Sequence, residues 1–318
     1  MSQYVERVVV SNPAQTRGMV SRPSINDEKA AEALAQLLQT GFVQPVWTPP
    51  ASLRALRCQV GHYLDLNRMR TQTLNRIRGL FQQELTDYQP GPTIGIRSRE
   101  VLDEQFRGEP RHRLYLCSLL RQYNLFNAEL AEIERSFGSW CRESKEATLL
   151  MTIPGMGPII AAMLVAQIGD IKRFPSAEHL CSYAGLVPRV YQSGTVLRRG
   201  RITRAGRSGM RWALHMCIWS QGLSKYSCSL TEFRKRLALK RPKLVAQVAA
   251  CRKLLSIIWS MLSHGSSFRE EDAELNARKS HRLAQWPEPS PEAYEIPDLK
   301  DPRPSRKSVY FPKASRTQ

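Results

Sequence analysis

Two long segments in the first half of the chain repeat apolar residues at heptad spacing. In the first, the apolar positions are 53, 56, 60, 63, 74, 77 and 81, and Asn67 and Arg70 interrupt them. In the second, the spacing is unbroken, at Leu116, Leu119, Tyr123, Phe126, Leu130, Ile133, Phe137 and Trp140. This spacing is typical of the a and d positions of a coiled coil. We predict a coiled-coil helical hairpin over residues 51–144, closed either within the chain or by a second copy in a homo-oligomer.

The first fifty residues show a different pattern. Val5 to Val10 reads as a strand, and a helix begins at Asn26 or Asp27 and ends near Gly41. One strand and one helix cannot bury a core by themselves. We therefore interpret residues 1–50 as the end of an α/β unit whose earlier strands are missing.

Residues 145–268 contain the most regular apolar patterns. These predict helices over 143–152, 158–168, 176–183, 207–223 and 240–263, and the last is strongly amphipathic. From residue 269 the chain is charged, and seven prolines follow Trp286. We predict that residues 269–318 form a disordered tail. The expected fold class is mainly α, with an α/β remnant, a helical hairpin and a helical C-terminal domain.

Composition narrows the function. The 318 residues carry a formal net charge of +19, so we expect an acidic partner, and nucleic acid is favoured over an anionic membrane. No apolar run reaches the roughly 18 residues of a membrane-spanning helix, and no signal peptide is expected at the start. The seven cysteines are scattered, with no CxxC pair. This scatter argues against zinc sites and disulfides and favours the cytoplasm.

Residues 153–157, Ile-Pro-Gly-Met-Gly, lie between two predicted apolar helices. This is the layout of a helix-hairpin-helix, in which Gly155, Met156 and Gly157 would offer backbone N–H groups to a phosphate. The alternative is an ordinary tight turn between helices, which needs a glycine but not this whole frame.

A run of arginines follows farther along the chain. Its members are Arg198, Arg199, Arg201, Arg204, Arg207 and Arg211, with no acidic residue among them. A charge run is usually a solvated face, but unpaired arginines repel one another and an anion relieves that repulsion. If five or six of them contact phosphates, a plot of log K against log salt should have a slope near about −5.

Two residues are candidates for chemistry. Ser193 precedes Gly194 just before the arginine run. A serine hydroxyl becomes a nucleophile only with a base, a metal or a dense positive field, and a Ser-Gly pair is otherwise a turn. Asp27 is the carboxylate of the N-terminal segment to consider as a metal ligand, and a role as helix N-cap explains it as well.

Taken together, these motifs resemble the bacterial insertion-sequence transposases of the one-ten, one-sixteen and nine-oh-two type, relatives of the Piv-type DNA invertases. The resemblance is dense over 148–268. It includes the segments LLMTIPGMGPIIAAML, QSGTVLRRGRITRAGRSGMR and KLVAQVAACRKLLSIIWSML. A thinner match covers residues 5–48.

The resemblance implies a RuvC-like N-terminal domain with four metal-binding carboxylates, a coiled coil for assembly and a C-terminal domain with a catalytic serine. It implies that Ser193 attacks a DNA phosphodiester to form a serine–DNA linkage, with Mg²⁺ held by the carboxylates. It also implies a structured guide RNA as a partner. Relatives place the serine in slightly different frames, so Gln192 and Ser208 are the alternatives.

The chain departs from the family pattern at the metal site. The family pattern has two aspartates three residues apart, and Asp27 matches the first while Ala30 replaces the second. Three hypotheses follow. The chain is a truncated transposase with impaired strand transfer, or an active recombinase whose missing piece is supplied in trans or encoded upstream. Alternatively, it is a non-catalytic helix-hairpin-helix protein that binds and bridges DNA sites.

Overall fold

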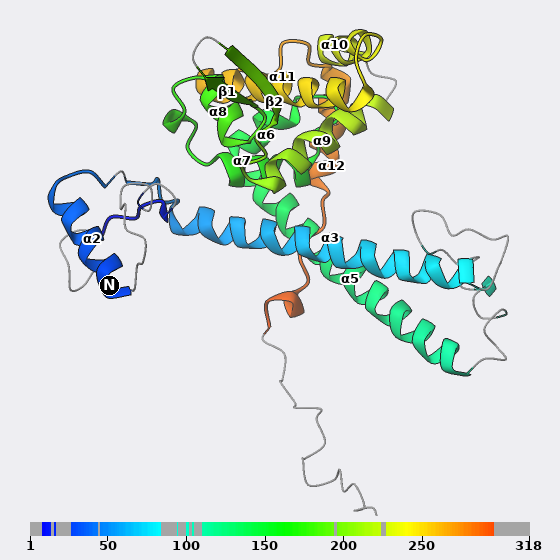
Figure 1. The fold of residues 1–318 in the computed structure, drawn as a ribbon. Helices are drawn as coiled ribbons and strands as arrows, with labels where there is room; N and C mark the ends of the chain where they lie inside the picture. Colours follow the sequence, from blue (N-terminus) through cyan, green and yellow to red (C-terminus); the bar gives the residue numbers. More distant parts are fainter. Residues whose placement is uncertain are drawn as a thin grey trace, which may run out of the picture.

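The computed structural model describes residues 8–13, 16, 27–43, 45–83, 94, 100, 101, 104, 110–193, 196–223 and 227–295. The elements in these ranges are α2 (Asp27–Gln39), α3 (Ala51–Gln83), α5 (Pro110–Glu143), α6 (Lys145–Met151), α7 (Pro158–Ile168), η1 (Ile171–Arg173), α8 (Ala177–Tyr183), β1 (Pro188–Ser193), β2 (Val196–Ile202), α9 (Ser208–Leu223), α10 (Ser229–Ala238), α11 (Lys243–His264), α12 (Ala273–Ala284) and η2 (Pro291–Tyr294). The predicted mainly helical fold is confirmed. Figure 1 shows α2 at one side, an arm made of α3 and α5, and a helical domain built from α6 to α12.

The arm is the helical hairpin that the heptad spacing predicts. The buried seam positions of α5 are Leu116, Leu119, Tyr123, Leu130 and Phe137, and those of α3 include Leu56, Val60, Tyr63, Leu74, Ile77 and Phe81. The seam closes between the two helices of one chain. The polar interruption is satisfied locally, because Arg70 donates to the side-chain oxygens of Asn67 at 2.8 Å and Asn127 at 3.4 Å. Assembly through the arm stays a prediction.

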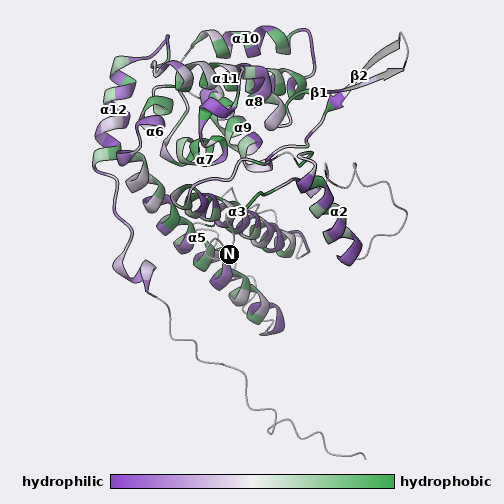
Figure 2. Cartoon of the chain, turned by 90° about the vertical axis from the view of Figure 1, so that its left-hand side faces the viewer, coloured by the Kyte–Doolittle hydropathy of each residue, from purple (hydrophilic) through white to green (hydrophobic). Residues whose placement is uncertain are grey.

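The core of the helical domain surrounds α7. Every residue of this helix from Ala161 to Ile168 is buried, as expected for a helix that is apolar on all sides. It packs against α3, α5, α6 and α9. Figure 2 shows apolar residues of α7 and α11 gathered inside the domain.

The longest helix of the domain, α11, is apolar. By length and composition it is the one helix among the described residues that could cross a membrane. It packs against α6, α8, α9, α10 and η1, and one face is buried from Ala246 to Met261. This is the packing of a core helix.

The sequence pattern does not predict the β1–β2 hairpin, η1, α10 or α12 of this domain. Residues 188–202 form a two-stranded antiparallel hairpin, β1–β2, where the sequence indicated only a turn at Ser193 and Gly194. The five helices that were predicted are present with small shifts in their ends.

The N-terminal unit differs from its prediction. The strand predicted over Val5–Val10 is not present at residues 8–10, and Ser11 forms an isolated bridge with Pro45. Residues 5–7 lie outside the described residues. The helix α2 is present as predicted, and Gly41 ends it with a positive φ of 73°. No residue of α2 is buried. Large apolar side chains are exposed across this unit, at Val8, Val10, Leu34, Leu38, Phe42 and Val46.

The prediction of a disordered tail from residue 269 is wrong for residues 269–295. These residues include α12 and η2, and we call residues 268–290 the C-terminal strap. It is anchored on α5: Trp286 Nε1 donates to the carbonyl of Glu134 at 3.1 Å, and Arg142 donates to the carbonyls of Leu283 and Trp286 at 3.2 and 2.9 Å. The charged composition of the segment predicts disorder, and it gives no sign of these few specific hydrogen bonds. Residues 296–318 lie outside the described residues.

A glycine makes the main anchor possible. A Cβ atom on Gly138 of α5 would lie 2.0 Å from Cδ1 of Trp286. We expect Gly138→Ala to lower the free energy of unfolding by about 1–3 kcal/mol, as overpacking does, and to expose the strap to limited proteolysis. The control is Gly61→Ala on α3, where a Cβ meets nothing within 4 Å and alanine favours the helix. Equal stability of the two variants would contradict the anchoring role.

Candidate nucleic-acid interface

The predicted hairpin loop lies between α6 and α7, as the helix-hairpin-helix frame requires. Gly155 has a φ of +77°, and Gly157 is the extended residue before α7, with Pro158 at the first helical position. Because no side chain caps α7 and proline has no N–H, the amides without an intrahelical acceptor at its start are those of Gly157, Ile159 and Ile160.

The middle of the loop packs against α9. A Cβ on Gly155 would lie 2.8 Å from the backbone oxygen of Cys217 on α9. Gln221 of α9 donates to the carbonyl of Pro154 at 2.7 Å, and Met156 is fully buried. The glycine at 155 is therefore required by the close approach of α9. Gly157, by contrast, has nothing within 4 Å of a built Cβ.

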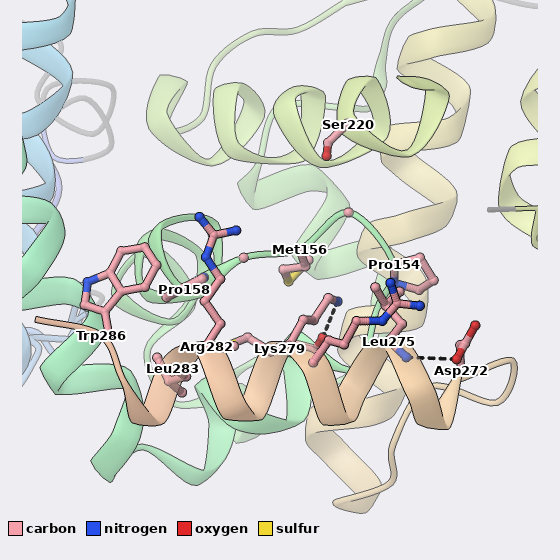
Figure 3. A pocket seen from close by; sticks show the side chains of 14 residues that line it. Pro154, Met156, Pro158, Ser220, Asp272, Leu275, Lys279, Arg282, Leu283 and Trp286 are labelled. Atoms are coloured by element: carbon pink, nitrogen blue, oxygen red, sulfur yellow. Dashed lines mark hydrogen bonds between the residues drawn. The ribbon is translucent and has the colours of Figure 1, made fainter. Parts of the chain in front are cut away.

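The carbonyl side of the same loop is held by the C-terminal strap. Lys279 of α12 donates to the carbonyls of Met151 and Ile153 at 2.6 and 2.7 Å. Figure 3 shows its side chain reaching from α12 to the loop. Burial lowers the pKa of Lys279 to about 8, although the nearby Cys217 raises it in part. Sequence reasoning missed this residue, because it lies in a segment that was predicted to be disordered.

The arginine run is divided among different roles. Arg211 donates to the carbonyls of Ala184 and Gly206 at 3.0 and 2.9 Å. Burial, together with the charge of Arg204, lowers its pKa. Arg201, Arg204 and Arg207 are exposed, and Arg207 donates to the hydroxyl of Tyr183 at 2.9 Å. The side chains of Ser193, Arg198 and Arg199 lie outside the described residues, although their backbones form β1 and β2.

A cluster of cations and aromatic rings surrounds the C-terminal end of α7. Arg57 donates to the carbonyls of Ala166 and Gln167 at 2.6 and 3.0 Å, and Arg173 donates to that of Ile168 at 3.1 Å. Both arginines stack on Trp47. They neutralise the negative end of the helix dipole.

Tyr183 connects the arginine run to this cluster. Its hydroxyl lies 3.4 Å from the carbonyl of Gln167 and accepts the bond from Arg207. Burial alone would raise the pKa of Tyr183, but hydrogen bonds and positive charge from Arg173 and Arg207 lower it below its ordinary value. The phenol therefore lies in a strongly positive environment.

The hairpin loop and the arginine run do not form one continuous DNA-binding surface. The hairpin loop lies at the N-terminal end of α7, and Arg207 lies at the C-terminal end through Tyr183 and Gln167. Eleven residues of helix span about 16 Å. The loop and the exposed arginines therefore form two separate surfaces.

The candidate metal ligand is isolated. Asp27 is exposed in the first turn of α2. Within the described ranges, no group of three or more His, Cys, Asp or Glu residues could hold a metal ion. These residues alone do not fit a Mg²⁺ site, because a hard cation takes about six oxygen ligands.

The two loop glycines should respond differently to the same substitution. We expect Gly155→Ala to lower the free energy of unfolding by about 2–4 kcal/mol, because it combines a positive φ with a backbone clash. Gly157→Ala should cost less than about 1 kcal/mol, because its Cβ enters open space. Urea unfolding of both variants measures the difference. A tolerated Gly155→Ala would show that α9 does not fix the loop.

Lys279 should make stability depend on pH. Its pKa in the folded state, about 8, lies below the value of 10.5 for the free side chain. The unfolded chain therefore binds the proton more tightly, and the folded state gains stability as pH rises through this range. Relative to Lys279→Met, the natural protein should gain about 1–2 kcal/mol between about pH 7.5 and about pH 9.5. Urea unfolding at the two pH values tests this, and a constant difference would contradict it.

Comparison with known proteins finds similarity to transposases. Residues 147–231 match the model of the Transposase IS116/IS110/IS902 family. The chain is 26% identical to a putative transposase y4pF/y4sB of Sinorhizobium fredii, over 86% of this chain and 71% of that protein. It is 27% identical to a transposase for insertion sequence element IS1328 of Yersinia enterocolitica, over 84% and 80%.

A third relative covers a shorter region. The pilin gene-inverting protein of Moraxella bovis is 37% identical over 124 residues, which are 38% of each chain. The matched segment spans α6 to α9 and the start of α10, and the relatives align over most of the chain, so this protein is similar to the IS116/IS110/IS902 family of transposases.

Proposed function

We propose that the protein acts on DNA as a transposase or recombinase and that Ser193 attacks the phosphodiester. The observation that carries this proposal is the register of the β1–β2 hairpin. Ser193 is the last residue of β1, paired with Val196, and Arg198 and Arg199 follow within the paired part of β2. One short hairpin therefore carries the serine and three arginines of the run, Arg198, Arg199 and Arg201. The relatives named as transposases and as a gene-inverting protein support DNA as the partner.

The proposed step is a transesterification. The serine oxygen forms a bond to phosphorus, the bond to one deoxyribose oxygen breaks, and the serine proton leaves so that the departing oxygen ends as a hydroxyl. Negative charge grows on the phosphate oxygens during this step. Guanidinium groups held close to those oxygens stabilise the charge. Arg201, Arg204 and Arg207 are exposed near the base of the hairpin and are suited to this role or to holding the DNA backbone.

The N-terminal part of the proposal concerns Mg²⁺. By resemblance, Asp27 is one ligand of a RuvC-like site in which a bound metal would stabilise charge. Such a site needs carboxylates in addition to those near Asp27 in the described residues. We propose that other segments or another copy of the chain supply them, and that the arm mediates that assembly. A guide RNA and a cytoplasmic location belong to the same proposal.

A second candidate is a non-catalytic DNA-bridging protein. The long arm formed by α3 and α5 and the isolation of Asp27 favour it. In this case the basic surfaces bind DNA, the arm joins two copies, and no covalent intermediate forms.

A denaturing gel separates the two candidates. With Mg²⁺ and DNA that carries the ends of the element, we expect a covalent protein–DNA adduct that is lost completely in Ser193→Ala. Ser208→Ala, at the exposed start of α9, is the matched control and should keep the adduct. An adduct that persists in Ser193→Ala would remove the assignment. Absence of any adduct, with DNA binding intact, would favour the bridging protein.

A further inference from the structure

A solvent-open groove of about 580 Å³ lies between the hairpin loop, α9 and α12. Gly157 and Pro158 line it from the loop, Ser220 from α9, and Arg278, Arg282 and Trp286 from the C-terminal strap. Figure 3 shows the Arg282 side chain rising from α12 toward α9, with the Ser220 hydroxyl directed into the same space. The groove is thus lined by both hydrogen-bond donors and positive charge.

The charges in the groove are unequal. Three lining residues are cations, Arg278, Lys279 and Arg282, and Asp272 is the one lining acid. Asp272 accepts the N–H of Leu275 as the N-cap of α12. The Lys279 ammonium is held by two carbonyls, and Arg278 pairs with Glu274 at 2.8 Å in an exposed pair. An exposed ion pair of this kind contributes little to stability, so Arg278 can leave it to bind an anion.

Arg282 is the most available cation of the groove. Its guanidinium lies 5.9 Å from the Trp286 ring, and no carboxylate of the described residues forms an ion pair with it. An arginine fork matches the paired oxygens of a phosphate. Ser220 and the backbone of Gly157 also line the groove and add neutral donors.

The strap holds these cations in place. Lys279 fixes the middle of α12 to the loop, and the anchor of Trp286 on α5 fixes its end. The backbone positions of Arg278 and Arg282, one helical turn apart, are therefore fixed beside the loop. This preorganisation reduces the entropy lost when an anion binds.

We propose that the groove is a second DNA-phosphate site, in which Arg278 and Arg282 of the C-terminal strap complete the hairpin loop. The inference rests on the proposed function, because it assumes that DNA is the partner. The arginine run at the other end of α7 forms the first site. The protein then binds the duplex at two places, the arginine run and the groove.

The test is a titration of duplex DNA with the full chain at several salt concentrations. We expect Arg278→Gln/Arg282→Gln to weaken binding roughly tenfold and to reduce the magnitude of the salt slope by about 1.8, at about 0.9 per lost contact. The control is Arg76→Gln/Arg121→Gln, which removes two exposed charges from the arm and should change neither quantity appreciably. Thermal unfolding establishes that all variants fold.

A second pair of substitutions keeps this inference separate from the proposed function. Arg204→Gln/Arg207→Gln removes cations of the arginine run. If it weakens binding while the strap variant behaves like the control, the groove proposal is overturned and the proposed function stands. If no variant affects DNA binding, both are overturned.

Two further measurements complete the design. Combining the strap and run substitutions should multiply the two losses, as expected for separate contacts. A parallel titration with single-stranded RNA identifies the source of the phosphate. A loss confined to RNA would overturn the assignment to DNA.

Discussion

The burial of α7 on every side is the constraint on which the rest of the structure depends. A helix whose residues from Ala161 to Ile168 are all buried leaves its backbone polar groups accessible only at the two ends. The chain closes these ends with different chemistry. At the start, the hairpin loop is pressed against α9 and held by Lys279. At the end, Arg57 and Arg173 bind the last carbonyls.

This arrangement determines where positive charge can serve a ligand. Arg57 and Arg173 bind the last carbonyls of α7 and so stabilise the fold. Their positive charge also acts on the neighbouring Tyr183. The start of α7 has no cation of its own, because the loop sequence contains none. The strap brings cations to it from more than a hundred residues later in the chain. The positive charge that is available to bind a polyanion therefore lies on two surfaces, one at each end of α7.

The sequence predicted those parts of the fold that a strong periodic pattern defines. The unbroken seam from Leu116 to Trp140 and the apolar run of α7 made the arm and the core helix clear. The β1–β2 hairpin escaped because its second strand, Val-Leu-Arg-Arg-Gly-Arg-Ile, hides the alternation of a strand behind arginines. The strap escaped because charge dominates its composition. A signal was present in Asp272 as a helix N-cap, with Leu275 and Leu283 at helical spacing.

The candidate site was predictable in its residue types but not in its geometry. A glycine in a hydrophobic-Pro-Gly-x-Gly motif indicates that another group comes close to its backbone. The motif alone does not show whether that group is a phosphate or a helix. Here the backbone of α9 approaches Gly155, so a helix accounts for this glycine, whereas nothing lies within 4 Å of a Cβ built on Gly157. Both glycines line the groove.

The arginine run illustrates the same limit. Six cations without an acid suggest six contacts with phosphate, but a carbonyl is an equally good acceptor for a guanidinium. Arg211 bonds the carbonyls of Ala184 and Gly206, and it holds the turn from which α9 begins. Its removal would disturb the fold before it changed any contact with DNA. The salt dependence that the run alone can generate is therefore smaller than the count of its arginines implies. Contacts from elsewhere, such as the groove, must supply the remainder if a slope near about −5 is observed.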